Sequence, residues 1–330
     1  MPHTTLHTLY GDPNTRAGLA ESPLWDAQRQ AWFWMDIDQH QIHQHTVRAD
    51  NDATHRVWQL PLEARYDIGA MALADNGDLM LALRAGIASF NPDQAQKNLS
   101  PEIRIPAPYD TNTTRFNDGG VDAQGRWWIG SLYAPKTHAG ANLFCLERDV
   151  LKPILGELAN TKPHTNWGMT TANGWAVSPD GTTMYHADTQ AHTVYRYDFD
   201  ARAPVETALS NRTVFFQTTD TRGTDAPLTT YQGRPDGAAV DSEGNYWLAL
   251  YEGAAIIKIA PNGNIVQKIP LPAKAPTMLC FGGTNLKTLI ITTAGNRPDS
   301  ELAHYPANGH ILTLKSDTAG LAPQRYRSSP

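Results

Sequence analysis

The sequence predicts an all-β protein, a six-bladed β-propeller formed by residues 1–330 as a single domain, and three observations lead to this fold. Helical periodicity is nearly absent, and short runs of β-branched and aromatic residues alternate with DG, NG, PDG and GG turns. One strand–turn–strand plan occurs six times along the chain. A chain of 330 residues is also long enough to form a closed all-β architecture in one domain.

The repeated unit is an apolar strand, a short polar turn and a second strand rich in aromatic residues or Leu. In chain order the six copies are PLWDAQRQAWFWMD, AMALADNGDLMLAL, GGVDAQGRWWIGSL, WAVSPDGTTMYHAD, AAVDSEGNYWLALY and MLCFGGTNLKTLIITT. A looser strand pair such as HTVYRYDFD follows most of them, so each unit predicts a four-stranded blade. We expect HTTLHTLY, near the N-terminus, to pair beside HILTLKS and close the ring, because closure removes exposed sheet edges. A tandem of β-sandwiches is the structural alternative.

Composition narrows the classes of partner. The formal net charge is -6 and no basic run occurs, so no nucleic acid partner is expected. No apolar stretch approaches the roughly 18–20 residues that a membrane span needs. The N-terminus has no signal-peptide pattern, which predicts a cytoplasmic protein, either a monomer or a small homo-oligomer. Cys145 and Cys280 lie in separate apolar runs and are expected to be free thiols.

Alignment of the six units predicts a ring of polar side chains. The units are superposed on the last apolar residue before each turn, and the position four residues earlier is then compared. That position holds Glu21, Gly69, Asn117, Asn173, Asp236 and Pro276. Four of the six carry a side-chain oxygen, and pseudo-symmetry predicts that these four meet near the axis. They are also common turn residues, but the hairpin turns of these units lie later, so NDG, NG and PDG are additional bends.

Two carboxylates that converge in a tunnel need a cation. Without one, Glu21 and Asp236 would repel each other and lose solvation. An all-oxygen set of ligands suits a hard ion such as Ca²⁺, Mg²⁺ or Mn²⁺, whereas Zn²⁺ normally brings His or Cys. The sequence therefore predicts one divalent metal cation in the central tunnel, with positions left for water and substrate.

Three other features have ordinary explanations. HQIHQH places His43 and His45 on one face of a strand near His40, where an exposed strand is a better explanation than a metal site. Asp180 falls on a hairpin turn and is expected to be a turn residue. Asp118 either orients a neighbouring arginine or caps the bend, and the sequence does not distinguish these roles.

At these residues the chain resembles the family of SMP-30 (regucalcin), gluconolactonases and related sugar lactonases. The motifs that carry the resemblance are AESPLWD, RFNDGGVDAQGRWWIGSL, NGWAVSPDGTTMYHADT, RPDGAAVDSEGNYWLAL and PTMLCFGGTNLKTLIITTA. The resemblance implies a six-bladed propeller with one divalent cation in the tunnel, held at Glu21, Asn173 and Asp236. It also implies that Arg115 and Asn117 contact substrate and that Asp236 acts as the general base.

The chain departs from animal members of that family after the third repeat. Those members continue with acidic residues that help to hold the substrate, whereas this chain reads SLYAPKTHAG. The sugar contacts are therefore expected to differ, which leaves room for an acidic or otherwise substituted lactone. Two long loops, 133–172 and 216–233, are candidate lids over the tunnel, with His164 or Trp167 as the covering side chain.

The predicted function is hydrolysis of a small-molecule sugar lactone, such as gluconolactone or a pentonolactone, to the aldonic acid. A calcium-dependent propeller that cleaves phosphotriesters would use a similar ring of oxygens, and the sequence separates the two poorly. A non-catalytic cation-binding propeller is the third hypothesis. Arg115 beside Asn117 argues against it, because a purely structural metal site tends to be closed.

Overall fold

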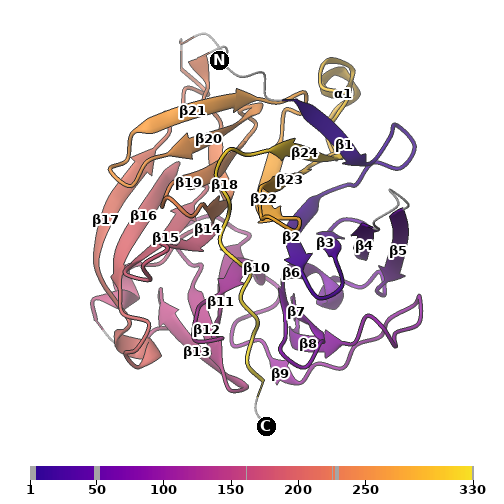
Figure 1. Cartoon of the computed structure of the whole chain (residues 1–330). Helices are drawn as coiled ribbons and strands as arrows, with labels where there is room; N and C mark the ends of the chain where they lie inside the picture. The colour runs from indigo at the N-terminus through magenta and orange to yellow at the C-terminus, as the bar shows by residue number, and fades with distance from the viewer. Residues whose placement is uncertain (1–4, 48–52, 161, 225, 227–229, 329–330) are drawn as a thin grey trace.

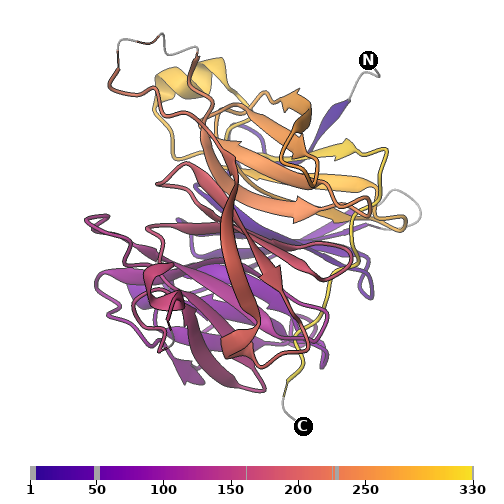
Figure 2. The ribbon, with the colours of Figure 1, turned by 90° about the vertical axis from the view of Figure 1, so that its left-hand side faces the viewer.

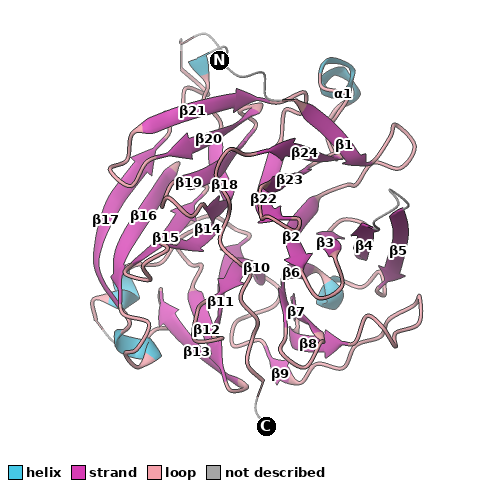
Figure 3. Cartoon of the chain, viewed as in Figure 1, coloured by secondary structure: helices cyan, strands magenta, loops and turns pink. Residues whose placement is uncertain are grey.

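The computed structural model of the chain describes residues 5–47, 53–160, 162–224, 226 and 230–328, and it shows six antiparallel sheets around a central axis (Figure 1). Each sheet has four strands. The inner strand of each sheet contacts the inner strand of the next, and the last contacts the first. The predicted six-bladed β-propeller is confirmed, and strands form most of its regular structure (Figure 3).

The blades follow chain order. Blades 1 and 2 consist of β2 (Ala20–Asp26), β3 (Ala31–Asp36), β4 (Gln41–Val47) and β5 (Ala53–Gln59), then β6 (Ile68–Leu73), β7 (Leu79–Leu83), β8 (Gly86–Phe90) and β9 (Ile105–Pro106). Blades 3 and 4 consist of β10 (Thr114–Val121), β11 (Trp127–Tyr133), β12 (Leu143–Glu147) and β13 (Val150–Leu155), then β14 (Ala172–Val177), β15 (Thr183–Asp188), β16 (Thr193–Phe199) and β17 (Leu209–Gln217). Blades 5 and 6 consist of β18 (Arg234–Val240), β19 (Tyr246–Tyr251), β20 (Ala255–Ile259) and β21 (Ile265–Pro270), then β22 (Pro276–Gly282), β23 (Thr288–Thr293), β24 (Ile311–Lys315) and β1 (Leu6–Tyr10). The helices of the described chain are short: η1 (Ala64–Tyr66), η2 (His164–Asn166), η3 (Val205–Thr207) and α1 (Asp299–His304).

The N-terminal strand closes the ring as predicted. β1 pairs antiparallel with β24 in blade 6, with Leu6 opposite Leu314. Residues 3 and 4 of the predicted HTTLHTLY strand lie outside the described residues. One blade thus combines the two ends of the chain, and the pairing covers an edge of β24 that would otherwise be open.

The hydrophobic core is divided among the six interfaces between neighbouring blades. Each buried cluster takes side chains from two adjacent blades, as Phe33 and Trp58 of blade 1 do with Leu81 of blade 2. The same arrangement recurs around the ring. Full burial of a large apolar side chain stabilises a fold by about 1.5–3 kcal/mol. Because this burial occurs between blades, a single blade has no core of its own and the ring is stable only as a whole.

Each inner strand has a break in its pairing register near the predicted ring position. The breaks lie at Glu21/Leu24, Ile68/Ala70, Asn117/Gly119, Asn173/Ala176, Pro235/Ala238 and Pro276/Leu279. The additional bends in the sequence are therefore β-bulges, which redirect side chains at the centre of the ring. Gly69 shows how crowded this layer is, because a Cβ there would come within 1.9 Å of the Phe116 carbonyl oxygen.

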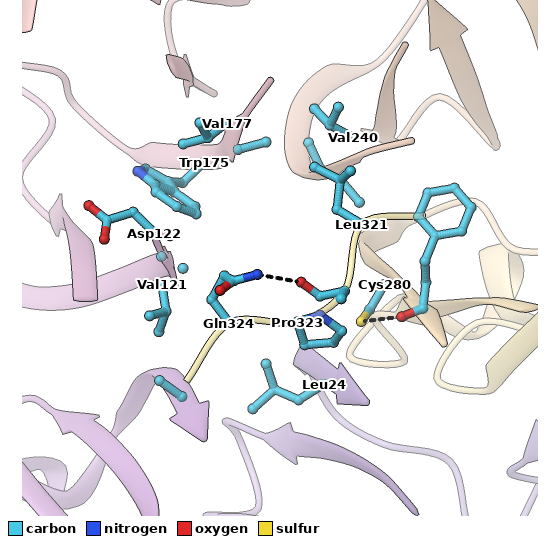
Figure 4. Close-up of a pocket in the computed structure, with 18 of the residues that line it drawn as sticks. Leu24, Val121, Asp122, Trp175, Val177, Val240, Cys280, Leu321, Pro323 and Gln324 are labelled. Atoms are coloured by element: carbon cyan, nitrogen blue, oxygen red, sulfur yellow. Dashed lines mark hydrogen bonds between the residues drawn. The ribbon is translucent and has the colours of Figure 1, made fainter. Parts of the chain in front are cut away.

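The C-terminal segment, residues 319–327, crosses one end of the tunnel on the side of the hairpin turns (Figure 1). The backbone N–H of Ser242 donates to Ala319 O at 2.8 Å, and that of Tyr326 donates to Leu73 O at 2.8 Å. Viewed from the side, this segment and α1 lie toward opposite sides of the disc (Figure 2). Beneath the segment is a cavity of about 360 Å³ with mainly apolar side chains, Trp175 and Leu321 among them (Figure 4). The tunnel is thus covered at this end, and the loops that precede the inner strands surround the other end.

Other expectations are tested directly. The two cysteines are free, as expected, although Cys280 is only half-buried. The expectation of an exposed strand at HQIHQH is wrong, because the His43 side chain is buried and its Nδ1 lies 3.1 Å from His55 Nε2. Among the described residues no helix is long and apolar enough to cross a membrane.

Candidate functional site

Arg115, Asn117 and Asn173 form a hydrogen-bonded chain across blades 3 and 4. Arg115 Nη1 donates to Asn117 Oδ1 and to the carbonyl of Phe116, both at 2.8 Å. Asn117 Nδ2 donates to Asn173 Oδ1 at 2.9 Å and to Ala172 O at 2.8 Å. The side-chain oxygen of Asn117 therefore faces the arginine, whereas the amide of Asn173 continues into the ring. These two predicted ring positions meet, but they are not equivalent.

Thr189 continues the chain into blade 5. Asn173 Nδ2 donates to Thr189 Oγ1 at 2.7 Å, and this hydroxyl donates to the carbonyl of Pro235 at 2.7 Å. Because the threonine fixes the amide nitrogen, it also fixes the direction of the Asn173 oxygen. Pro235 immediately precedes Asp236, so the chain joins three of the predicted ring positions. Thr189 follows the end of β15 and is the last residue of the motif NGWAVSPDGTTMYHADT, but no role was predicted for it from the sequence.

Glu21 and Asp236 are the carboxylates of the ring. Desolvation and, to a smaller extent, the negative charge of Asp118 raise the pKa of Glu21 to about 8, and the positive charge of Arg115 opposes that rise. Desolvation also raises the pKa of Asp236 well above its ordinary value, with added repulsion from Glu21 and Asp118. The two ring carboxylates therefore lie within electrostatic reach of each other in a poorly solvated place. A cation or a proton must compensate such a pair.

Asp118 caps the bend, which decides the alternative that the sequence left open. Its Oδ1 accepts from Gly119 N–H at 2.6 Å and its Oδ2 accepts from Trp175 N–H at 3.2 Å. Its backbone is left-handed, with φ 49°. Burial raises the pKa of Asp118 to about 6, and the backbone N–H groups oppose that shift. The side chain joins the bulge of β10 to the bulge of β14, so it holds Asn117 and Asn173 in register.

The ring has the chemistry of a site for a hard cation. Two carboxylates and the amide oxygen of Asn173 are oxygen donors of the type that Ca²⁺, Mg²⁺ or Mn²⁺ prefers. No group of three or more His, Cys, Asp and Glu side chains in the described ranges has an arrangement that would hold a metal ion. A cation in the ring would therefore depend on an amide and on water in addition to Glu21 and Asp236. That open coordination is typical of a catalytic metal site rather than a structural one.

A second group of charged side chains lies beside the ring on blade 5. Arg234, two residues before Asp236, donates from Nη2 to Glu252 Oε2 at 2.9 Å. Arg297, from the loop before α1, donates to Glu252 Oε1 at 3.3 Å. The ring of Tyr251 lies 5.0 Å from the Arg234 guanidinium carbon and 5.7 Å from that of Arg297. This group was not predicted from the sequence, although Arg234 precedes Asp236 by the same two residues that separate Arg115 from Asn117.

The structure gives no support to a covering role for His164 and Trp167. His164 is buried and its Nε2 lies 3.0 Å from the carbonyl of Leu209 in the outer strand β17. Trp167 packs on the His164 ring at 4.9 Å and on Tyr197 at 5.6 Å. Both side chains therefore pack against the outer strands of blade 4. The second candidate lid, 216–233, falls partly outside the described residues. Asp180 is a turn residue as expected, since its Oδ1 accepts from Thr182 N–H at 3.0 Å.

The fold and the ring define a class of protein: a six-bladed β-propeller with poorly solvated carboxylates and linked asparagines at the uncovered end of its tunnel. Residues 19–295 match the family described as SMP-30/Gluconolactonase/LRE-like region, and the chain belongs to that family.

Known relatives resemble the chain over most of its length. It is 32% identical to a 6-deoxy-6-sulfogluconolactonase from Pseudomonas putida, over 92% of this chain and 93% of that protein. It is 27% identical to a pentonolactonase from Haloferax volcanii, over 87% and 85% of the two chains. Its fold superposes on a solved calcium-binding protein, regucalcin from Agrobacterium tumefaciens, with a TM-score of 0.77, 22% identity and 95% coverage of each chain. The last comparison shows a shared fold.

Proposed function

We propose that the protein hydrolyses a sugar lactone with the help of one divalent cation held by Glu21, Asn173 and Asp236. The observation that carries the proposal is the pair of poorly solvated carboxylates, both with raised pKa, beside an amide whose direction is fixed by Thr189. The lactonase names of relatives that cover most of this chain support the substrate class. The relative from Pseudomonas putida is named for a lactone that carries a sulfonate.

The residues of the ring divide the work of lactone hydrolysis. A bound cation would supply Lewis-acid stabilisation of the negative charge that develops on the lactone carbonyl oxygen. Arg115, whose Nη1 already holds Asn117, orients the sugar by donating N–H groups to its hydroxyl oxygens. A carboxylate oxygen of Asp236 takes a proton from the water whose oxygen bonds to the carbonyl carbon, and the bond between that carbon and the ring oxygen then breaks. The same oxygen returns the proton to the ring oxygen that leaves.

Burial of Asp236 has a consequence for this role. In the absence of a compensating charge its raised pKa favours the protonated form, which cannot accept a proton from water. A neighbouring positive charge lowers the pKa and restores the carboxylate. The proposal therefore makes both the charge state of Asp236 and the turnover dependent on the cation.

The test is proton release from a panel of lactones by the chelated and then the metal-restored protein. The panel contains glucono-1,5-lactone, a pentonolactone and 6-deoxy-6-sulfogluconolactone, with paraoxon as the phosphotriester. We expect lactone turnover that disappears with chelator, returns with one divalent ion, and falls at least about 10²-fold in Asp236→Asn. Asp180→Asn, which changes an exposed turn carboxylate, is the matched control. Turnover of paraoxon alone would favour the phosphotriesterase, and metal binding without any turnover would favour a non-catalytic propeller.

A further inference from the structure

The layer of side chains directly above the ring is rich in cations. Residues two apart on a strand face the same side, which applies to Arg115 in β10 and Arg234 in β18. The contact of Arg115 with Asn117 shows that this position reaches the ring. In blades 1 to 6 the position two residues before the ring residue holds Leu19, Asp67, Arg115, Thr171, Arg234 and Lys274. Three of the six are cationic in a chain whose net charge is -6. The only carboxylate among them, Asp67, is already paired with Arg84 at 2.6 Å.

Arg234 is a member of this layer with a buried donor that lacks a hydrogen-bond partner among the described residues. Its Nη2 is bonded to Glu252, but its Nε is buried and has no hydrogen-bond partner among the described residues. The side chain is 16% exposed, so it is accessible from the tunnel mouth without being free in solvent. A buried N–H group that lacks an acceptor is unfavourable and indicates a place for a ligand or a water molecule.

The neighbours of Arg234 hold its guanidinium in one orientation. Glu252 accepts from Arg234 on one oxygen and from Arg297 on the other. Arg297 is itself anchored to Glu301, at 2.6 Å from Nε and 3.0 Å from Nη2. Tyr251 stacks against both guanidiniums, and its hydroxyl accepts from Arg297 Nη1 at 3.2 Å. A donor held in this way loses little conformational freedom when an acceptor arrives.

We propose that Arg234 recognises an anionic substituent on the lactone, at the end of the sugar remote from the carbonyl. This inference rests on the proposed function, because it assumes that the carbonyl lies at the ring. Two residues along a strand are about 6.6 Å apart, measured between their Cα atoms. This distance is of the same order as that from the carbonyl carbon of a six-membered lactone to the outer atoms of a group on C6. A guanidinium donates two N–H groups in parallel to the oxygens of a sulfonate, phosphate or carboxylate. The proposed substrate of this chain is therefore a lactone that carries an anionic group.

The test compares anionic with neutral lactones in the wild type and in Arg234→Met. The substrates are 6-deoxy-6-sulfogluconolactone, 6-phosphogluconolactone, a lactone with a C6 carboxylate, and glucono-1,5-lactone. We expect the wild type to have a higher kcat/KM on at least one anionic lactone than on the neutral one. Arg234→Met should reduce that selectivity by about 10–100-fold, mainly through KM, as expected for loss of a charge-assisted hydrogen bond. The ranking of the three anionic lactones identifies the preferred group.

Two further variants separate recognition from structure. Arg234→Lys keeps the charge and loses the planar fork, so its selectivity should fall between that of the wild type and Arg234→Met. Arg212→Met removes a guanidinium that stacks at 3.7 Å on Tyr195 in the outer part of blade 4, and its selectivity should equal that of the wild type. Melting temperatures show whether Arg234→Met is folded. If it is folded and its selectivity equals that of the wild type, the inference is overturned, whereas lactone hydrolysis as the proposed function is unaffected.

A protein without any lactone turnover would contradict the proposed function and still test the recognition site. In that case calorimetry measures the binding of 6-phosphogluconate and of gluconate. Tighter binding of the phosphorylated acid, lost in Arg234→Met, would support an anion site. Equal affinity for the two acids would overturn it.

Discussion

Replacement of Thr189 by valine tests whether the hydrogen-bonded chain through the ring positions Asn173. The hydroxyl of Thr189 is buried, accepts from Asn173 Nδ2 at 2.7 Å and donates to Pro235 O at 2.7 Å. Valine has nearly the same shape, so the loss is confined to two hydrogen bonds. Each buried group left without a partner costs about 1–3 kcal/mol. We therefore expect Thr189→Val to lower the free energy of unfolding by about 2–6 kcal/mol.

The same substitution should weaken cation binding, because the Asn173 amide would no longer be held in one direction. Removal of a group that orients a metal ligand typically lowers metal affinity by about 10–100-fold. The measurements are urea denaturation of the chelated protein and calorimetric titration with Ca²⁺ and Mn²⁺. Thr293→Val is the matched control, because its buried hydroxyl also makes two hydrogen bonds, at 3.2 Å to Ala307 O and 2.7 Å to His310 O, and neither of them is to a ring residue.

The two variants give different results if the reasoning is correct. Both should lose stability, and only Thr189→Val should lose affinity for the ion. Equal affinities in the wild type and Thr189→Val would show that the orientation of Asn173 does not matter for the ion. Unchanged stability in Thr189→Val would refute the hydrogen-bonded chain itself.

Three other perturbations have defined outcomes. Burial lowers the pKa of His43 to about 3, so the unfolded chain binds a proton that the folded chain does not, and stability should fall as the pH drops below about 6.5. At pH 4.5 the loss of unfolding free energy from His43 alone is about 2–3 kcal/mol. The measurement is urea denaturation at a series of pH values: in His43→Phe the unfolding free energy should fall less steeply below about pH 6.5, and an unchanged slope would contradict this. Gly69→Ala should reduce the melting temperature or prevent folding, because its Cβ would lie 1.9 Å from Phe116 O; a normal melting curve would show that the inner strands can separate. Removal of residues 319–330 should expose the cavity of about 360 Å³, lower the melting temperature and increase binding of a hydrophobic dye. Removal of only the last two residues should have none of these effects.

Much of the fold could be predicted from the sequence because its determinants are local. Each blade repeats one strand–turn–strand pattern, and a residue's place in the pattern decides which face of the sheet it occupies. That regularity made Glu21, Asn117, Asn173 and Asp236 comparable across blades before any contact was known. It also made the N-terminal strand recognisable as the missing strand of blade 6, since a ring with an open edge is unfavourable.

The direction of the side chains within the ring could not be predicted in this way. Asn117 and Asn173 occupy equivalent positions, yet the oxygen of one faces Arg115 and the oxygen of the other faces Asn117. The difference depends on neighbours from other strands, such as Thr189 after β15, whose role no local pattern indicates. The sequence also could not predict where His164 and Trp167 pack, which was expected to be over the tunnel. The packing of a loop depends on the surfaces that it meets, and these belong to other parts of the chain.

The sequence by itself determined the number of blades, and it predicts the ring residues and the oxygen chemistry of the site. These features follow from periodicity and from residue type, which are properties of the chain alone. Only the tertiary structure decided that Arg297 meets Glu252 beside Arg234, and that the C-terminal segment covers one end of the tunnel. Such contacts join residues distant in sequence, and their geometry exists only once the blades have packed into a closed ring.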